Sequence, residues 1–268
     1  MKEDKGLWMC ASGAFYFLLD FSCRKEKEMF ARLASQIGEN VGFVLVVVLV
    51  AAIIIALASV TEKTFLKNSV NRVGRTRYIA ICGMFGAIAG ILMLFEFPLV
   101  LIAPSFYKLD FSELPVMIGG MYLGPVAAVL IELVKIVLKL IIKGTTTAFV
   151  GDFANFAVGC SLVLPAVIIY HTKKNRSRAL IGLIVGTFTI AVFGSAFNAF
   201  YLLPAFSKLY GMPLDAIIGM GTAINSRITG IGSFVMIAVF PLNLIKGAAI
   251  SLLTMLIYKH ISRLLHSM

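Results

Sequence analysis

The sequence is poor in charge, because only 14% of its 268 residues are Asp, Glu, Lys or Arg, whereas 60% are hydrophobic. Soluble globular domains have about 45–50% apolar and about 25% charged residues. The composition therefore excludes an ordinary soluble domain and predicts an integral membrane protein. Lys and Arg outnumber Asp and Glu by 24 to 13, but they lie in short segments between long apolar runs. This pattern argues against nucleic-acid binding and favours a multi-pass protein with positive-inside topology.

Cysteine and histidine are also scarce, with four and three residues. The cysteines form no CxxC pair and the histidines lie in basic flanks, so we expect neither a metal site nor a disulfide framework. The sequence also lacks the HExxH, GxSxG and GxxxxGK[ST] motifs. We therefore expect no enzyme and no cofactor. Any uphill work would need energy from a partner protein.

What the sequence does have is long hydrophobic runs. The first, residues 42–60, is 19 consecutive uncharged residues, close to the roughly 20 that cross a bilayer core. We interpret it as an additional transmembrane anchor helix. It follows an N-terminal leader, residues 1–41, and precedes a basic linker, residues 61–77.

Six further apolar segments predict one all-α membrane domain over residues 78–258, with a tail over 259–268. The segments are 78–95, 114–124, 126–142, 153–170, 179–203 and 233–258. The second is short, because 11 residues rise only about 17 Å in a core of about 30 Å.

Charge predicts the topology of this domain. The basic segments 61–77 and 171–178 both belong on the cytoplasmic side, so an even number of membrane crossings separates them. The short segment 114–124 must therefore be one of these crossings. The expected cytoplasmic segments hold 11 basic residues and one acidic residue: 61–77, 171–178 and 259–268. The expected outer loops hold four basic and five acidic residues: 96–113, 143–152 and 204–230. We therefore expect both termini of the six-helix core in the cytoplasm of a cell-membrane protein, and the leader outside.

Ionisable residues within apolar segments are costly and need a reason. Glu132, Lys135 and Lys139 share one helix face, where Glu132 can pair with Lys135. A structural ion pair with Lys139 reaching outward and a functional role are both open. Lys246 has Asn243 on its face and no acid in its own segment. Its burial predicts either a polar cavity with ligand acceptors or bonds to helix carbonyls.

Two asparagines extend this polar set at the outer end of the domain. Asn198 lies near the outer end of 179–203 and Asn155 near the outer start of 153–170. An amide offers both a donor and an acceptor, which suits a planar heterocycle with alternating carbonyl and N–H edges. Singly, each could bond a neighbouring helix, and only their convergence indicates a site.

Small residues recur on the first core helix. Gly83 with Ala87, and Gly86 with Gly90, give the spacing that permits close helix approach. Internal packing and docking of a partner are both open explanations.

Several motifs in order resemble the substrate-binding S components of energy-coupling-factor (ECF) vitamin transporters, most of all the riboflavin-specific type. The motifs are FEFPL (95–99), LDFSELP (109–115), GGMYLGPVAAVLIELVK (119–135), GDFANFAVG (151–159), FNAFYLLP (197–204) and PLNLIKG (241–247). The resemblance covers residues 76–264. It implies a six-helix S-component fold with an outward-facing vitamin site, closed by the first outer loop.

The resemblance also implies roles for particular residues. The flavin ring would be held by Asn198, Asn243 and Lys246. Further contacts along riboflavin would come from the closing loop and from the start of the fourth core helix: Leu109, Asp110, Gly151 and Asn155.

Partners follow from the same resemblance. A transmembrane coupling subunit with two cytoplasmic ATPases would energise uptake of riboflavin from outside, and FMN is left open as a second ligand. Gly83 and Ala87 match the small-residue pair used for docking, although alanine is commoner than glycine at the first position.

The anchor helix and leader have no counterpart in the resemblance. The alternatives are an S component for thiamine, folate or a similar heterocycle, and, with less support, an intramembrane enzyme or a structural protein. A cationic vitamin would avoid a buried lysine and favour an acid, and Glu132 is the one intramembrane acid that the segments offer.

Overall fold

A computed structural model describes residues 41–267 except 68, 72, 146 and 148. The predicted leader therefore lies outside the described residues, save for its last position. The chain divides into two compact units, Met1–Leu45 and Val46–Met268. Helix α2 (Val41–Phe65) begins in the first unit and continues in the second, to which everything below refers.

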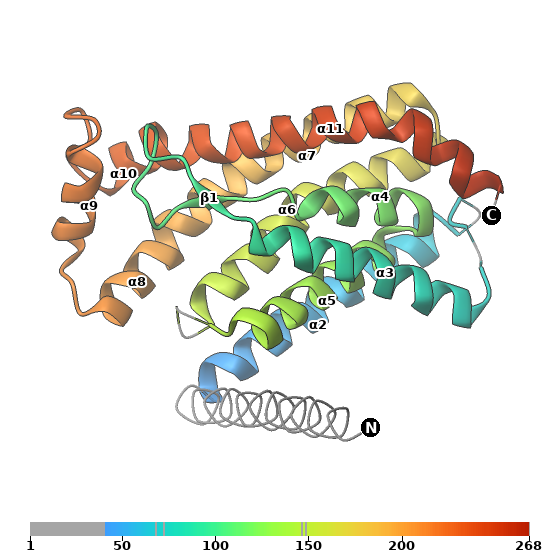
Figure 1. Ribbon diagram of the computed structural model, residues 1–268, viewed down its shortest axis with the longest axis horizontal. Helices are drawn as coiled ribbons and strands as arrows, with labels where there is room; N and C mark the ends of the chain where they lie inside the picture. The colour runs from blue at the N-terminus through green and yellow to red at the C-terminus, as the bar shows by residue number, and fades with distance from the viewer. Residues whose placement is uncertain (1–40, 68, 72, 146, 148, 268) are drawn as a thin grey trace, which may run out of the picture. The chain divides into compact units, whose positions relative to one another are not determined.

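The described residues of the second unit form helices and one short strand pair, joined by loops (Figure 1). Its main helices overlap the six predicted core segments: α3 (Arg75–Leu94), α4 (Glu113–Leu123), α5 (Pro125–Lys143), α6 (Val150–Lys173), α7 (Arg176–Phe197) and α11 (Phe240–Ser267). The π-helical turn η1 (Asn198–Leu202) continues α7. The short helix α10 (Ile231–Phe234) and the π-helical turn η2 (Val235–Val239) lead into α11.

The predicted outer loops contain more structure than expected. Residues 204–230 were expected to be a loop, but they include most of α8 (Leu203–Tyr210) and all of α9 (Leu214–Thr222). In the first loop, β1 (Phe97–Pro98) pairs antiparallel with β2 (Lys108–Leu109), with Phe97 opposite Leu109. Buried apolar residues of α8, α9 and η2 pack with Ala103 and Tyr107 of the first loop, which explains why both segments are ordered.

Among the described residues, five helical stretches are long and apolar enough to cross a membrane. They are Val47–Phe65, Arg75–Leu94, Val150–Lys173, Arg176–Leu209 and Ile231–Ile257. Helix α5 has 19 residues but is interrupted by charged side chains, and α4 has only 11 residues. The chain is thus a multi-pass membrane protein whose two remaining core helices are short or charged.

Local sequence sets several helix boundaries. Gly124 has φ +116° between α4 and α5, a conformation that residues with a Cβ rarely adopt, and Pro125 occupies the first position of α5. Asn175 caps α7 by accepting a hydrogen bond from the Arg178 N–H at 2.8 Å.

Helix α2 contacts the core through buried alanines and, near its C-terminal end, through Glu62. Ala51 and Ala58 are buried in a cluster with Val129 of α5 and Phe156 of α6. Near its end, a Glu62 carboxylate oxygen accepts from the Val126 N–H at 3.3 Å, which satisfies a free donor at the start of α5. The helix continues to Phe65, beyond its predicted end at residue 60.

Helices α6 and α7 lie side by side in close contact (Figure 1). A methyl group at Gly182 would lie 2.5 Å from the carbonyl oxygen and 3.2 Å from the Cα of Ala166. Because backbone atoms cannot turn aside as a flexible side chain can, the two helices need glycine here to approach.

We therefore expect Gly182→Ala to lower the free energy of unfolding by about 1–3 kcal/mol through overpacking. The measurement is thermal unfolding of the purified protein in detergent. Gly219→Ala is the matched control, because a methyl group there would meet nothing within 4 Å. Equal unfolding midpoints for the two variants would contradict the close approach of α6 and α7.

Candidate ligand-binding site

A cavity of about 300 Å³ lies at the end of the bundle where α6 begins and α7 ends. This volume is at the lower end of the range for small-molecule sites. Six of the seven predicted ligand contacts line it: Leu109, Gly151, Asn155, Asn198, Asn243 and Lys246. The structure thus brings together residues from the first loop, α6, η1 and α11.

The start of α6 is fixed by the threonines before it. Thr147 Oγ1 accepts from the Gly151 N–H at 3.0 Å, and Thr145 Oγ1 accepts from the Phe149 N–H at 3.0 Å. Phe149 has φ +68°, so the chain turns sharply just before the helix. These bonds hold Gly151 at the cavity wall, and Asn155 lines the cavity one turn further along α6.

Asn198 is held by contacts on both sides of its amide. Its Nδ2 donates to the Gly194 carbonyl at 2.7 Å, and its Oδ1 accepts from the Tyr107 hydroxyl at 2.7 Å. Burial raises the pKa of the Tyr107 phenol, so the hydroxyl keeps its proton and remains a donor. Tyr107 also lines the cavity. Tyr107 was not predicted from the sequence, because its contact with Asn198 joins residues 91 positions apart.

Asn243 packs against Gly194 of α7, whose carbonyl accepts the hydrogen bond from Asn198. A methyl group at Gly194 would lie 2.7 Å from Asn243 Nδ2 and 3.0 Å from its Cγ. Gly194 therefore makes the space that the Asn243 amide occupies. The position was not expected from the sequence, because a single glycine in an apolar helix carries no signal of its partner.

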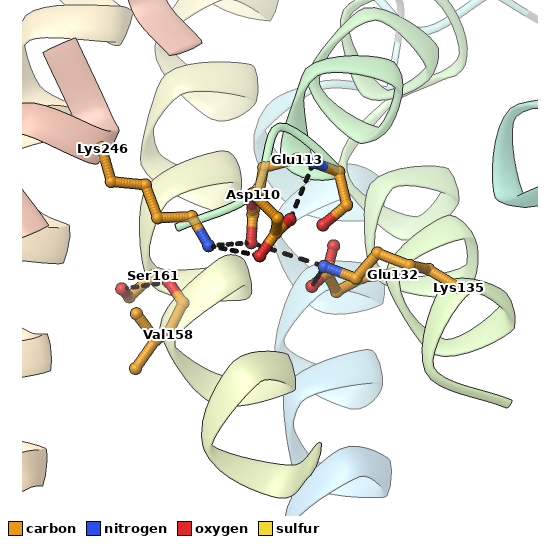
Figure 2. A network of polar contacts seen from close by, with 8 residues as sticks. Asp110, Glu113, Glu132, Lys135, Val158, Ser161 and Lys246 are labelled. Carbon is orange, nitrogen blue, oxygen red and sulfur yellow. Dashed lines mark hydrogen bonds and ion pairs between the residues drawn. The ribbon is translucent and has the colours of Figure 1, made fainter. Parts of the chain in front are cut away.

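The surroundings of Lys246 correct the picture of an isolated lysine. Its Nζ lies 2.8 Å from Glu113 Oε1 and 3.3 Å from Asp110 Oδ2 (Figure 2). Both acids were counted in an outer loop, yet Glu113 is 1% exposed and Asp110 is 4% exposed. Glu132 is therefore not the one buried acid. Asp110 is the predicted site residue that does not line the cavity, and it acts on Lys246 instead.

Asp110 is fixed as a carboxylate. Its Oδ1 accepts from the Ser112 N–H at 2.8 Å. Burial tends to raise the pKa of Asp110, but the ammonium groups of Lys246 and Lys135, with the hydrogen bond from the Ser112 N–H, lower it to about 2. Asp110 is thus ionised at neutral pH.

The predicted pairing of Glu132 with Lys135 is confirmed, with Nζ 2.5 Å from Glu132 Oε1. Lys135 also lies 3.4 Å from Glu113 Oε1, so Glu113 stands between two lysines (Figure 2). Lys139 does not simply reach outward, because it pairs with the buried Asp152 of α6.

Unsatisfied acceptors remain on the cavity wall. Within the described chain, Asp152 Oδ2 and Asn155 Oδ1 are buried without a hydrogen-bond partner. Both residues line the cavity, so both oxygens are available to donors of a ligand. At the cavity edge, Glu96 pairs with Lys108 at 2.7 Å and also with Lys143.

The walls between these polar groups are apolar, contributed by Phe106, Leu202, Phe206 and Leu242. Such a cavity can hold a planar molecule between hydrophobic faces and bind its edge through amides and an ammonium group. Phe206 belongs to α8, so the segment after η1 takes part in the cavity. The described residues contain no group of three or more metal-binding side chains.

The two small-residue pairs of α3 have different surroundings. Gly86 and Gly90 are buried against Val134 and Leu138 of α5. Gly83 and Ala87 are exposed on the opposite face, and a methyl group at Gly83 would meet nothing within 4 Å. The first pair serves internal packing, and the second is exposed.

The chain is similar in sequence to a known family and to individual proteins. A family model described as ECF transporter, substrate-specific component, matches residues 77–258. The chain is 32% identical over 199 residues to the riboflavin transporter RibU of Staphylococcus aureus (strain TCH60), covering 74% of this chain and 97% of that protein. It is 29% identical over 185 residues to the riboflavin transporter FmnP of Bacillus subtilis (strain 168), covering 69% and 91%.

A solved structure is also similar. It is described as the structure and mechanism of the S component of a bacterial ECF transporter. The TM-score is 0.56 at 30% sequence identity, and the match covers 72% of this chain and 99% of that chain.

The buried ion pairs predict a large effect of Lys135→Met. Lys135 is fully buried, and its loss leaves the Glu113 and Glu132 carboxylates short of positive charge. We expect the free energy of unfolding to fall by about 3–5 kcal/mol. Lys108→Met removes an ion pair whose lysine side chain is 43% exposed, and should cost less than about 1 kcal/mol. Thermal unfolding in detergent compares the two, and similar midpoints would rule out the buried network.

Proposed function

The chain belongs to the substrate-specific components of ECF transporters, and we propose that it binds riboflavin from the extracellular side and mediates its uptake. The family is one of transporter components and not of enzymes. Riboflavin is the ligand named for relatives of about 30% identity that match over most of their length.

The observation that carries the proposal is the convergence of Asn198, Asn243 and Lys246 in one cavity with apolar walls. An isoalloxazine ring has broad apolar faces and a uracil-like edge of carbonyl and N–H groups. The faces suit the phenylalanines and leucines, and the edge suits two amides and an ammonium group. The ribityl hydroxyls can donate to the free oxygens of Asp152 and Asn155.

A cationic vitamin such as thiamine is disfavoured by the pairing of the buried acids and not by their absence. Buried acids are available, but each one near the cavity already faces a lysine: Asp110 and Glu113 face Lys246, and Asp152 faces Lys139. A cation entering this site would have to compete with an ammonium group for each carboxylate. An uncharged heterocycle meets no such competition.

The topology of uptake follows from the charge pattern. We infer that the core termini are cytoplasmic and that the cavity end faces outward, since the basic segments lie at the other end of the helices. The partners would be a transmembrane coupling subunit and two cytoplasmic ATPase subunits. The bilayer surrounds the assembly, and the core is preceded by the basic linker over 61–77 and the additional helix.

The proposal is tested by titrating the purified protein with riboflavin and following the quenching of flavin fluorescence. Wild type should quench stoichiometrically, and Asn243→Ala and Lys246→Ala should each bind about tenfold or more weakly. Gly194→Ala should also weaken binding, because its methyl group displaces the Asn243 amide, while Gly219→Ala should bind as wild type.

FMN is the second ligand for the same titration. A folded wild type that quenches neither flavin would refute the proposal, and thiamine and folate would then be the ligands to test.

The exposed pair Gly83 and Ala87 predicts the docking surface for the coupling subunit. Ala87→Leu should reduce co-purification of the coupling and ATPase subunits and abolish uptake, because the larger side chain prevents close helix approach. Riboflavin binding should stay unchanged. Ala56→Leu, an exposed position of α2 outside the family match, is the control. Normal assembly of the Ala87→Leu variant would place the docking surface elsewhere.

A further inference from the structure

The ammonium group of Lys246 pairs with two carboxylates that do not line the cavity. Lys246 lines the cavity, whereas Asp110 and Glu113 lie behind it, in and just before the first turn of α4. The two contacts join α11 to a segment more than 130 positions earlier in the chain. Figure 2 shows the lysine side chain reaching from α11 toward both carboxylates.

Glu113 is itself held from a second side. Its Oε1 lies 2.8 Å from Lys246 Nζ and 3.4 Å from Lys135 Nζ, so one carboxylate oxygen faces two ammonium groups. Lys135 is in turn paired with Glu132. A carboxylate fixed in this way has little freedom to move, and it limits where the Lys246 ammonium can lie.

This arrangement determines what Lys246 can offer to a ligand. An ammonium group has three N–H donors, and two of them are directed at Glu113 and Asp110. One donor is left for the cavity. The flanking carboxylates also cancel the charge of Lys246, which lowers the attraction of the site for an anion and favours an uncharged ligand with a carbonyl acceptor.

We propose that Glu113 is a positioning and specificity-determining residue for ligand binding, which acts through Lys246 by fixing its ammonium group and cancelling its charge. The inference rests on the proposed riboflavin function and deepens it. Glu113, which does not line the cavity, would then determine whether the site prefers an uncharged or a charged ligand.

The test compares wild type, Glu113→Gln, Lys246→Met and the double variant in two measurements with riboflavin. The first is affinity by fluorescence quenching. Glu113→Gln keeps an oxygen acceptor but removes the charge, and it should bind riboflavin about tenfold more weakly. In the Lys246→Met background the same change should have little further effect, because Glu113 acts through Lys246.

The second measurement is the visible absorption band of the bound flavin, which responds to charge beside the ring. Glu113→Gln makes the site more positive and Lys246→Met makes it more negative, so the band should move in opposite directions in the two variants. It should return toward the wild-type position in the double variant. A merely structural role of Glu113 would not produce this reversal.

Two variants complete the design. Asp215→Asn removes an exposed carboxylate of α9 and should behave as wild type. Asp110→Asn removes the second carboxylate beside Lys246, so it should shift the absorption band in the direction expected for Glu113→Gln. This variant keeps the test possible if Glu113→Gln folds poorly.

The outcomes separate the two claims. If wild type binds riboflavin and Lys246→Met binds weakly, but Glu113→Gln and Asp110→Asn match Asp215→Asn, the role of Glu113 is refuted and the riboflavin function stands. Additive affinity losses, or band shifts in the same direction for Glu113→Gln and Lys246→Met, also refute it. A folded wild type that binds no riboflavin refutes both.

Discussion

The need to neutralise buried charge connects the parts of this membrane protein. Lys246 and Lys135 are buried in an apolar bundle, where an unpaired ammonium group is strongly unfavourable. Their partners come from three different segments: the loop before α4, α4 itself and α5. Because Glu113 of α4 pairs with both Lys135 of α5 and Lys246 of α11, the network fixes these three helices relative to one another behind the cavity.

The cavity depends on this network and on close packing around it. Gly194 makes space for the Asn243 amide, and the Tyr107 hydroxyl orients the Asn198 amide. Each of these two residues determines where an asparagine amide lies. The site is therefore better described as two amides and one ammonium group held by neighbours than as three independent side chains.

Much of the fold could be predicted from the sequence because its signals are local. The apolar runs of α6 and α7, the pairing of Glu132 with Lys135 three residues on, and the small-residue spacing of α3 are all visible within one helix. The family resemblance selected six residues that share the cavity wall. The helices α8 and α9 were missed because their burial depends on contacts with the first loop, far away in the sequence. Glu113 was missed for the same reason, since its contact with Lys246 spans 133 positions.

The central claim, that this cavity binds riboflavin through Asn243 and Lys246, is tested most directly by a structure of the protein determined with riboflavin. The account predicts the isoalloxazine ring in the cavity between α6, η1 and α11, with its uracil-like edge within hydrogen-bond distance of the Lys246 ammonium group and the Asn243 amide. Lys246 would keep its contact with Glu113. Riboflavin bound elsewhere, or with that edge turned away from Lys246, would contradict the account.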